Sequence, residues 1–244
     1  MTSFALRCLA LLTMICDHAG YALYSSMPWL RIVGRLSFPI YCFLLAQGFR
    51  HTRNVKGYAL RLGLFALISE VPFNLLFYRR VWMPAAHNVF FSLLLALGAL
   101  AACKRFAREK PFWAGLCVVA ACALALLLHT DYTFLGILLA LAFYAAEERP
   151  LRLALGFAGV LGLYTLYRLD TNVPARWVVT QLYSLLSLPL ILLYNGKPGF
   201  RGGKWLFYLL YPAHLLALVY WKNILALFRP AAAAHTIWQI ISSF

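Results

Sequence analysis

Acidic residues are scarce in this chain, with seven aspartates and glutamates against 22 lysines and arginines in 244 residues. Charged residues of both signs make up only 12% of the sequence, about half of what soluble domains carry. Hydrophobic residues account for 64%, and the mean hydropathy is +0.77. This composition excludes an ordinary soluble domain and indicates a protein that crosses the membrane several times.

Several chemical patterns are also missing. The six cysteines form no CxxC pair and lie within or at the ends of apolar runs, so they indicate small core residues and not an external disulfide framework. There is no HExxH motif, so no metal site is expected. The formal net charge of +15 sits in short loops between apolar runs, where it sets orientation and meets anionic lipid or ligand, and no nucleic-acid partner is expected.

Nine apolar runs approach the length needed to cross a bilayer, about 20 residues with allowance for tilt. The predicted fold is an all-α polytopic membrane helical bundle with about nine transmembrane helices, within a range of eight to ten. Residues 1–244 form one domain, and residues 231–244 are expected to be an interfacial helix or a short tenth crossing. The runs are Phe4 to Tyr24, Ile32 to Phe49, Tyr58 to Phe77, Val89 to Cys103, Phe112 to Leu128, Thr133 to Ala146, Leu151 to Tyr167, Trp177 to Tyr194 and Trp205 to Trp221.

The first run is expected to be retained, because it is interrupted by Asp17 and His18 and has no clear small-residue cleavage site. A cytoplasmic N-terminus places 14 of the 22 lysines and arginines on the inner side and leaves 8 outside. The positive-inside rule therefore favours this orientation, in a multi-pass protein of the cytoplasmic membrane.

Polar residues gather at one predicted depth in the outer half of this bundle. An intramembrane charge costs a few kcal/mol, so it usually faces the protein interior. Two interpretations stay open: a polar cavity, or structural pairs such as Arg35 with Asp17 or Glu70. The residues at this depth are Asp17, His18, Arg35, Glu70, Asn74 and Asn88.

A second pattern links this layer to the inner surface. Arg7 and His18 are 11 residues apart in the sequence, which on a helix places them on one face, about 16 Å apart along the axis. Guanidinium groups suit phosphate, so a long anionic molecule is one explanation for the basic inner surface, and ordinary positive-inside charge is the other. The inner basic group comprises Arg7, Arg50, His51, Arg53 and Arg61, joined by Lys197, Arg201 and Lys204 if the loops fold together.

The remaining histidines and acids divide by position. His214 lies within the ninth run beside Tyr211, and either lines a ligand tunnel or forms a structural hydrogen bond. His87, His129 and His235 lie near loops and are expected to be solvated or interfacial. Asp131, Glu147 and Glu148 are expected to be ordinary loop charges.

Seven collinear segments resemble the TraX family, whose founding member is the pilin N-acetylase of conjugative plasmids. The spacing of Arg7 and His18 is similar to the first-helix signature of the wider transmembrane acyltransferases. The resemblance implies a bacterial inner-membrane enzyme that takes an acetyl group from cytoplasmic acetyl-CoA. The segments are Met14 to His18, Gly34 to Ile40, Gly48 to Asn54, Tyr58 to Leu62, Ser69 to Asn74, Asn88 to Phe91 and Tyr211 to Leu215.

Acyl transfer to an amine or hydroxyl needs a proton acceptor, and a neutral histidine suits that role, so His18 is the expected general base. Arg35, Asn74 or Asn88 would stabilise the oxyanion. Direct transfer and an acyl-histidine intermediate both stay open. The catalytic set is Asp17, His18, Arg35, Glu70 and Asn74, and the donor-binding set is Arg7, Arg50, His51, Arg53, Arg61, Lys204, Tyr211 and His214.

The acceptor would be a peptide N-terminus, a sugar, a lipid headgroup or a small amine, reached from the membrane or its outer face. Two rivals belong to other functional classes. A transporter or channel would use the polar layer as a permeation site and cleave no thioester. A non-catalytic scaffold protein would tolerate His18→Ala.

Overall fold

The computed structural model describes residues 1–147, 149–171, 174–200 and 204–228. These residues are largely helical, and within them no strand forms beyond an isolated bridge between His87 and Thr130, which confirms the predicted all-α bundle. The helices are α1 (Ser3–Ala22), α2 (Pro28–Gly34), α3 (Ser37–His51), α4 (Val55–Tyr78), α5 (Val89–Phe106), α6 (Pro111–Leu127), α7 (Thr133–Ala145), α8 (Pro150–Asp170), α9 (Ala175–Leu182), the 3₁₀ helix η1 (Tyr183–Ser187), α10 (Leu188–Leu192) and α11 (Lys204–Phe228).

Each of the nine predicted apolar runs coincides with one of these helices or with a consecutive set of them. Six helical segments are long and apolar enough to cross a membrane, while α6 and α7 are shorter apolar helices. The number of crossings and the cytoplasmic N-terminus stay predictions. The predicted helix over residues 231–244 lies outside the described residues.

Two predicted spans are divided by breaks that the sequence explains through proline. The second run is split between α2 and α3 at Arg35 and Leu36, and Pro39 then falls in the first turn of α3. The eighth run is split into α9, η1 and α10, with Pro189 in the first turn of α10. Proline is tolerated in a first turn because its missing N–H has no partner there. The first break brings Arg35 to the end of α2.

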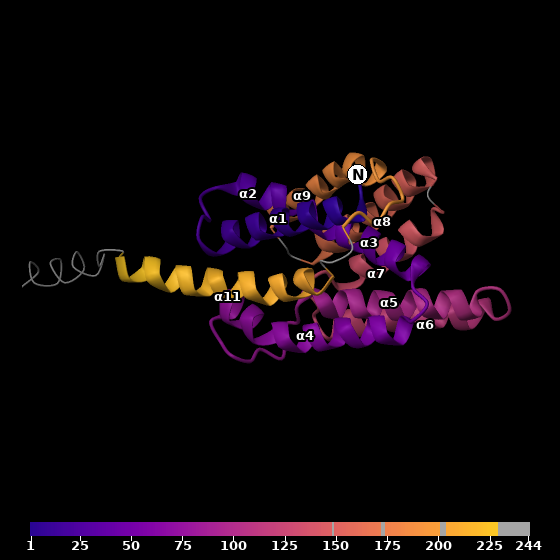
Figure 1. Ribbon diagram of the computed structural model, residues 1–244, viewed down its shortest axis with the longest axis horizontal. Coiled ribbons are helices and arrows are strands. Elements are labelled where there is room, and N and C mark those ends of the chain that lie inside the picture. Colours follow the sequence, from indigo (N-terminus) through magenta and orange to yellow (C-terminus); the bar gives the residue numbers. More distant parts are fainter. Residues whose placement is uncertain (148, 172–173, 201–203, 229–244) are drawn as a thin grey trace, which may run out of the picture.

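The helices pack in two groups around α11. Helix α1 contacts α2, α3 and α11, whereas α5 contacts α4, α6 and α7. Helix α11 contacts both α1 and α4, and Figure 1 shows it lying lengthwise between them. Residues from α1, α4 and α11 therefore face one another across the interior.

Glycines allow α1 and α2 to approach closely. A Cβ at Gly20 would lie 2.7 Å from the Leu30 Cβ, and a Cβ at Gly34 would lie 2.2 Å from the Asp17 Cβ. Small residues at such contacts let helix backbones meet. Any larger residue at Gly34 would displace the Asp17 carboxylate.

Candidate active site between two cavities

Asp17, on α1, is buried and binds two arginines. Its Oδ2 accepts a hydrogen bond from Arg31 Nη1 at 2.8 Å and forms a second ion pair with Arg35 Nη2. Arg35 Nη1 also donates to Gln181 Oε1 at 3.3 Å. The pairing of Arg35 with Asp17, one of the two predicted partners, is present, and Arg31 is an additional partner. Asp17 Oδ1 has no hydrogen-bond partner among the described residues.

His18, the next residue, is buried and pairs with the histidine of α11. His18 Nδ1 lies 2.8 Å from His214 Nε2, and the two rings are nearly parallel. His214 Nδ1 lies 2.9 Å from the Leu210 carbonyl oxygen. Of the two interpretations left open for His214, the structure therefore contains the hydrogen bond.

This chain of contacts fixes the protonation of both neutral rings. A carbonyl oxygen only accepts, so His214 Nδ1 carries its proton and donates to Leu210, which leaves His214 Nε2 as an acceptor. His18 Nδ1 must then donate to it. The tautomers are assigned from this hydrogen-bond network. His18 Nε2 is left with a lone pair, as a general base requires.

Three cavities lie in series along the bundle, and His18 lines the middle one. The inner cavity has a volume of about 320 Å³, the middle cavity about 20 Å³ and the outer cavity about 470 Å³. Asp131 and Tyr132 line both the middle and the outer cavities. Met14, Tyr41, Val89 and Tyr211 line both the inner and the middle cavities. A constriction that contains Asp17 and His18 therefore separates two larger spaces.

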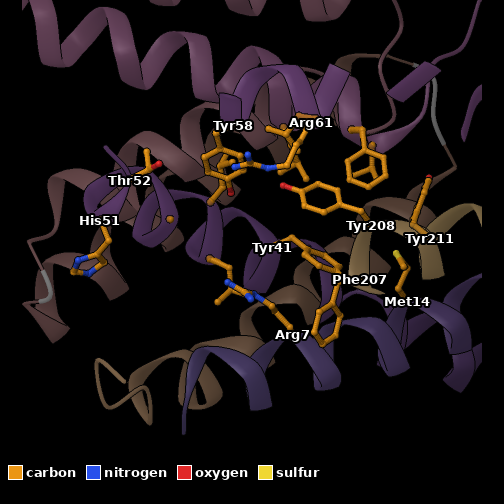
Figure 2. A pocket seen from close by; sticks show the side chains of 17 residues that line it. Arg7, Met14, Tyr41, His51, Thr52, Tyr58, Arg61, Phe207, Tyr208 and Tyr211 are labelled. Atoms are coloured by element: carbon orange, nitrogen blue, oxygen red, sulfur yellow. The ribbon is translucent and has the colours of Figure 1, made fainter. Parts of the chain in front are cut away.

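The inner cavity carries part of the predicted basic group. Figure 2 shows Arg7 and Arg61 entering from opposite walls, with the ring of Tyr208 beside them. His51 also lines the cavity, whereas Tyr211 lines the end nearest His18. Arg7 and His18, both on α1, thus line two consecutive cavities.

Two other members of the predicted donor-binding set, Arg50 and Arg53, lie elsewhere. Arg50 donates from Nη2 to the Tyr144 carbonyl oxygen at 2.8 Å, and its guanidinium lies over the Tyr144 ring. Arg53 is exposed, and neither arginine is part of the cavity lining. Lys204 is the first residue of α11. The structure therefore brings Arg7, His51, Arg61 and Tyr211 together and leaves Arg50 and Arg53 outside.

Glu70, predicted to belong to the catalytic set, lies in a separate network. Its Oε1 contacts His87 Nδ1 at 2.8 Å, and its Oε2 accepts from Asn88 Nδ2 at 2.6 Å. Asn88 Nδ2 donates also to the Ala66 carbonyl oxygen at 2.8 Å. His87 was expected to be solvated or interfacial, but its ring is largely buried and binds the carboxyl group of Glu70. Glu70 lines none of the three cavities.

The Glu70 network holds the loop between α6 and α7. The Asp131 N–H donates to the His87 carbonyl oxygen at 2.9 Å, and the His87 N–H donates to the His129 carbonyl oxygen at 3.3 Å. His129 and Thr133, on either side of Asp131, have positive φ angles of 47° and 44°. Such unfavourable backbone conformations persist only where surrounding contacts impose them.

Asp131 is therefore fixed in place between the middle and outer cavities. Asp131 is exposed toward the cavity, yet the protein atoms around its carboxyl group raise its pKa to about 6, while the charges of Arg35 and Arg31 oppose that rise. Asp131 is a loop charge, as expected, but it lines two cavities, which the sequence did not predict. The available signal was the short polar sequence His129 to Tyr132 between two apolar runs.

Asn74 is completely buried in α4, and neither its Nδ2 nor its Oδ1 has a partner among the described residues. It lines none of the three cavities. Within the described part of the chain, no three histidine, cysteine, aspartate or glutamate side chains are grouped so that they could hold a metal ion.

Comparison with known proteins gives two matches and one negative result. A family model described as TraX protein matches residues 3–222. A protein named "Probable fimbrial assembly protein FimC, serogroup H1", from Dichelobacter nodosus, is 31% identical over 242 residues, which cover 89% of this chain and 94% of that protein. No solved structure matches the chain.

Proposed function

The chain belongs to the TraX family of membrane proteins, and from this premise we propose that it is an acyltransferase. It moves an acetyl group from cytoplasmic acetyl-CoA to an amine or hydroxyl of an acceptor that arrives from the other side of the bundle. The observation that carries the proposal is the position of His18, at a constriction between a cavity with a basic end and a second, polar cavity. Two separate substrates need this arrangement.

The inner cavity suits the acyl-CoA donor. Arg7 and Arg61 provide two guanidinium groups that can bind phosphates, and His51 lines the same cavity. The remainder of the wall is largely aromatic and aliphatic, which fits the less polar arm of the donor. A donor with its phosphates at the arginines would direct its thioester toward Met14 and Tyr211, where the inner and middle cavities meet.

In the transfer step, the acceptor nitrogen or oxygen attacks the thioester carbonyl carbon and loses its proton to His18 Nε2. The tetrahedral intermediate collapses, the carbon–sulfur bond breaks, and the leaving sulfur takes the proton back from His18. The products are the acylated acceptor and free coenzyme A thiol. His214 acts as a positioning residue, because its Nε2 holds the proton of His18 on Nδ1.

The oxyanion needs a hydrogen-bond donor near the thioester. Both amide protons of Asn88 are used by Glu70 and Ala66. Arg35 has Asp17 and Gln181 as partners. Tyr41 and Tyr211 line both the inner and the middle cavities. We therefore assign the oxyanion contact to these two tyrosine hydroxyls.

The relative from Dichelobacter nodosus is named for fimbrial assembly, so a fimbrial subunit is one candidate acceptor. Transport is the second candidate function, because cavities in series also describe a permeation path. The constriction argues against passage of a large solute: its volume of about 20 Å³ is close to the space of one water molecule.

The deciding experiment measures acetyl-CoA binding and slow thioester cleavage by purified protein in detergent, without any acceptor. Wild type and His18→Ala are compared, and thermal unfolding checks that both are folded. Binding by both with cleavage only by the wild type supports the proposal. Absence of binding by folded wild-type protein would remove the donor assignment and favour transport, whereas equal cleavage by both variants would remove His18 as the base.

A further inference from the structure

The outer cavity has a lining unlike that of the inner one. It is bordered by α2, α8 and α9, by the ends of α1 and α4, and by the loop that carries Asp131. Its volume of about 470 Å³ falls in the range of small-molecule sites. The charged residues of its wall are Arg31, Arg35, Asp131 and Arg168, and its aromatic residues are Tyr21, Phe77, Tyr78, Tyr132, Tyr164 and Trp177.

The cavity arginines are held against aromatic rings, but they differ in their ionic partners. Arg31 lies over Tyr21 and Trp177, with its Cζ 5.5 Å from each ring centre. Arg31 and Arg35 share the carboxylate of Asp17. Arg168 lies 5.8 Å from the centre of the Tyr164 ring and pairs with no carboxylate in the described parts of the chain. One oriented cation therefore remains available to a ligand.

The opposite charge lies beside the reaction centre. Asp131 lines the outer cavity and also the middle cavity that contains His18, whereas Arg168 lines the outer cavity alone. Three arginines face two carboxylates, those of Asp17 and Asp131, so the cavity has an excess of positive charge. A ligand with an acidic group compensates this excess, and an acceptor that carries only an ammonium group adds to it.

On the premise of the acyltransferase function, we propose that the outer cavity binds the acceptor and selects one with an acidic group. The acceptor is a headgroup-sized molecule that carries a phosphate or carboxylate together with an amine or hydroxyl. Arg168 binds the acidic group, since a guanidinium matches its geometry. Asp131 then faces the amine or hydroxyl and directs it toward the constriction at His18.

Binding of matched probes to the purified full-length protein, measured by calorimetry without acyl-CoA, tests this assignment. Glucosamine 6-phosphate is compared with glucosamine, and O-phosphoethanolamine with ethanolamine, so that each pair differs by the phosphate. We expect each phosphate compound to bind at least ten times more tightly than its partner. Equal binding within both pairs, or no binding of either phosphate compound, overturns the proposal.

Variants then locate the site. We expect Arg168→Gln to abolish most of the preference for the phosphate compounds and Arg168→Lys to retain part of it. Arg80→Gln is the matched control. Arg80 is exposed and follows the end of α4 that borders the outer cavity, but it is not part of the cavity lining. A preference that survives Arg168→Gln, or that falls equally in Arg80→Gln, contradicts the assignment.

A competition experiment distinguishes the source of the acidic group. Displacement of glucosamine 6-phosphate by micelles of lysophosphatidylethanolamine, but not of a neutral detergent, would identify a lipid headgroup as the acceptor. Resistance to both would identify a soluble phosphate. A C-terminally amidated peptide with a free N-terminus and no acidic residue that displaces the probe as well as the phosphate compounds do would overturn the selection.

The same wild-type protein also separates this proposal from the proposed function. If glucosamine 6-phosphate binds through Arg168 while acetyl-CoA does not bind, the outer site stands and the acyltransferase fails. If acetyl-CoA binds and is cleaved while the phosphate probes fail, the acyltransferase stands and the acceptor class is wrong.

Discussion

The inner and outer cavities both contain arginines, but the two sites treat these charges differently. At the inner cavity Arg7 and Arg61 have no carboxylate partner in the described structure. At the outer cavity Arg31 and Arg35 are neutralised in part by Asp17, and only Arg168 is left without one. A site for a polyanion needs several free cations, whereas a site for one acidic group needs one. On the proposed function, the number of unpaired arginines, more than the total number of arginines, distinguishes the donor cavity from the acceptor cavity.

The largest expected effect comes from the constriction that separates the cavities. His18→Ala removes the base, so thioester cleavage and acyl transfer should fall by about 10²–10⁴-fold, while acetyl-CoA still binds. Single-turnover kinetics with radiolabelled acetyl-CoA measures the loss. Cleavage at the wild-type rate would show that the chemistry lies elsewhere.

Removal of the Asp17 carboxylate tests whether it neutralises Arg31 and Arg35 at the outer cavity. Asp17→Asn leaves two largely buried guanidinium groups without their counter-charge, which should destabilise the fold by about 3–5 kcal/mol. Unfolding in mixed detergent measures the change. Glu147→Gln is the control, because its pair with Arg152 is exposed and 3.9 Å long and should contribute about 0–1 kcal/mol. Equal effects of the two variants would contradict the ionic role of Asp17.

The free arginines of the inner cavity should govern donor affinity. Arg61→Gln should weaken acetyl-CoA binding by about 10- to 100-fold, the usual size of a charge-assisted hydrogen bond to phosphate. Arg53→Gln is matched in charge and lies at the same end of the molecule but outside the cavity lining, so it should change binding by less than about threefold. A larger effect at Arg53 would extend the donor site beyond the cavity.

His214 should affect rate more than donor binding. His214→Phe keeps a ring but removes the acceptor for His18 Nδ1, and should slow cleavage by about fivefold, because a neutral hydrogen bond contributes about 1 kcal/mol. His214→Asn keeps an acceptor oxygen and should restore part of the rate. Measurement of kcat and KM for the two variants checks this difference in rate. Equal kcat values would show that His214 contributes only packing.

The smallest expected effect concerns Asp131, the acidic residue in the lining of the outer cavity. The pKa of Asp131 is raised to about 6 by desolvation, with Arg35, Arg31 and Asp17 as the charges that face it. Asp131 is neutral below that pH and negative above it, while the arginines keep their charge. Binding of a probe whose acidic group keeps its charge over this range, such as glucosamine 6-sulfate, should therefore weaken about three- to fivefold as the pH rises from 5 to 7. Asp131→Asn should remove this part of the pH dependence, and an unchanged profile would show that another group titrates.

Hydropathy was sufficient to predict the all-α bundle and the helix positions, because an apolar run must bury its backbone polar groups in a helix. The spacing of Arg7 and His18 predicted a ligand path along α1, and the two residues do line consecutive cavities. The Asp17 pair with Arg35 was foreseen as one of two alternatives. These predictions rest on local periodicity, which the sequence carries directly.

The remaining features depend on how distant segments meet. Glu70 was predicted to be catalytic and Asp131 to be a loop charge, but the path of the chain at His87 decides that Glu70 supports the loop and Asp131 faces a cavity. Likewise, the direction of Arg50 toward α7 follows from helix rotation, which short loops and a basic surface do not specify. His18 and His214 lie 196 positions apart in sequence, and no periodicity reveals that contact.

The contact between Asp17 and Arg31 also bears on how the chain enters the membrane. The two residues are 14 positions apart and belong to successive helices that glycines bring together. The counter-ion of Asp17 is therefore supplied by the segment that follows it directly in the chain, and it does not depend on the later helices. Such a local partner lowers the cost of an intramembrane aspartate.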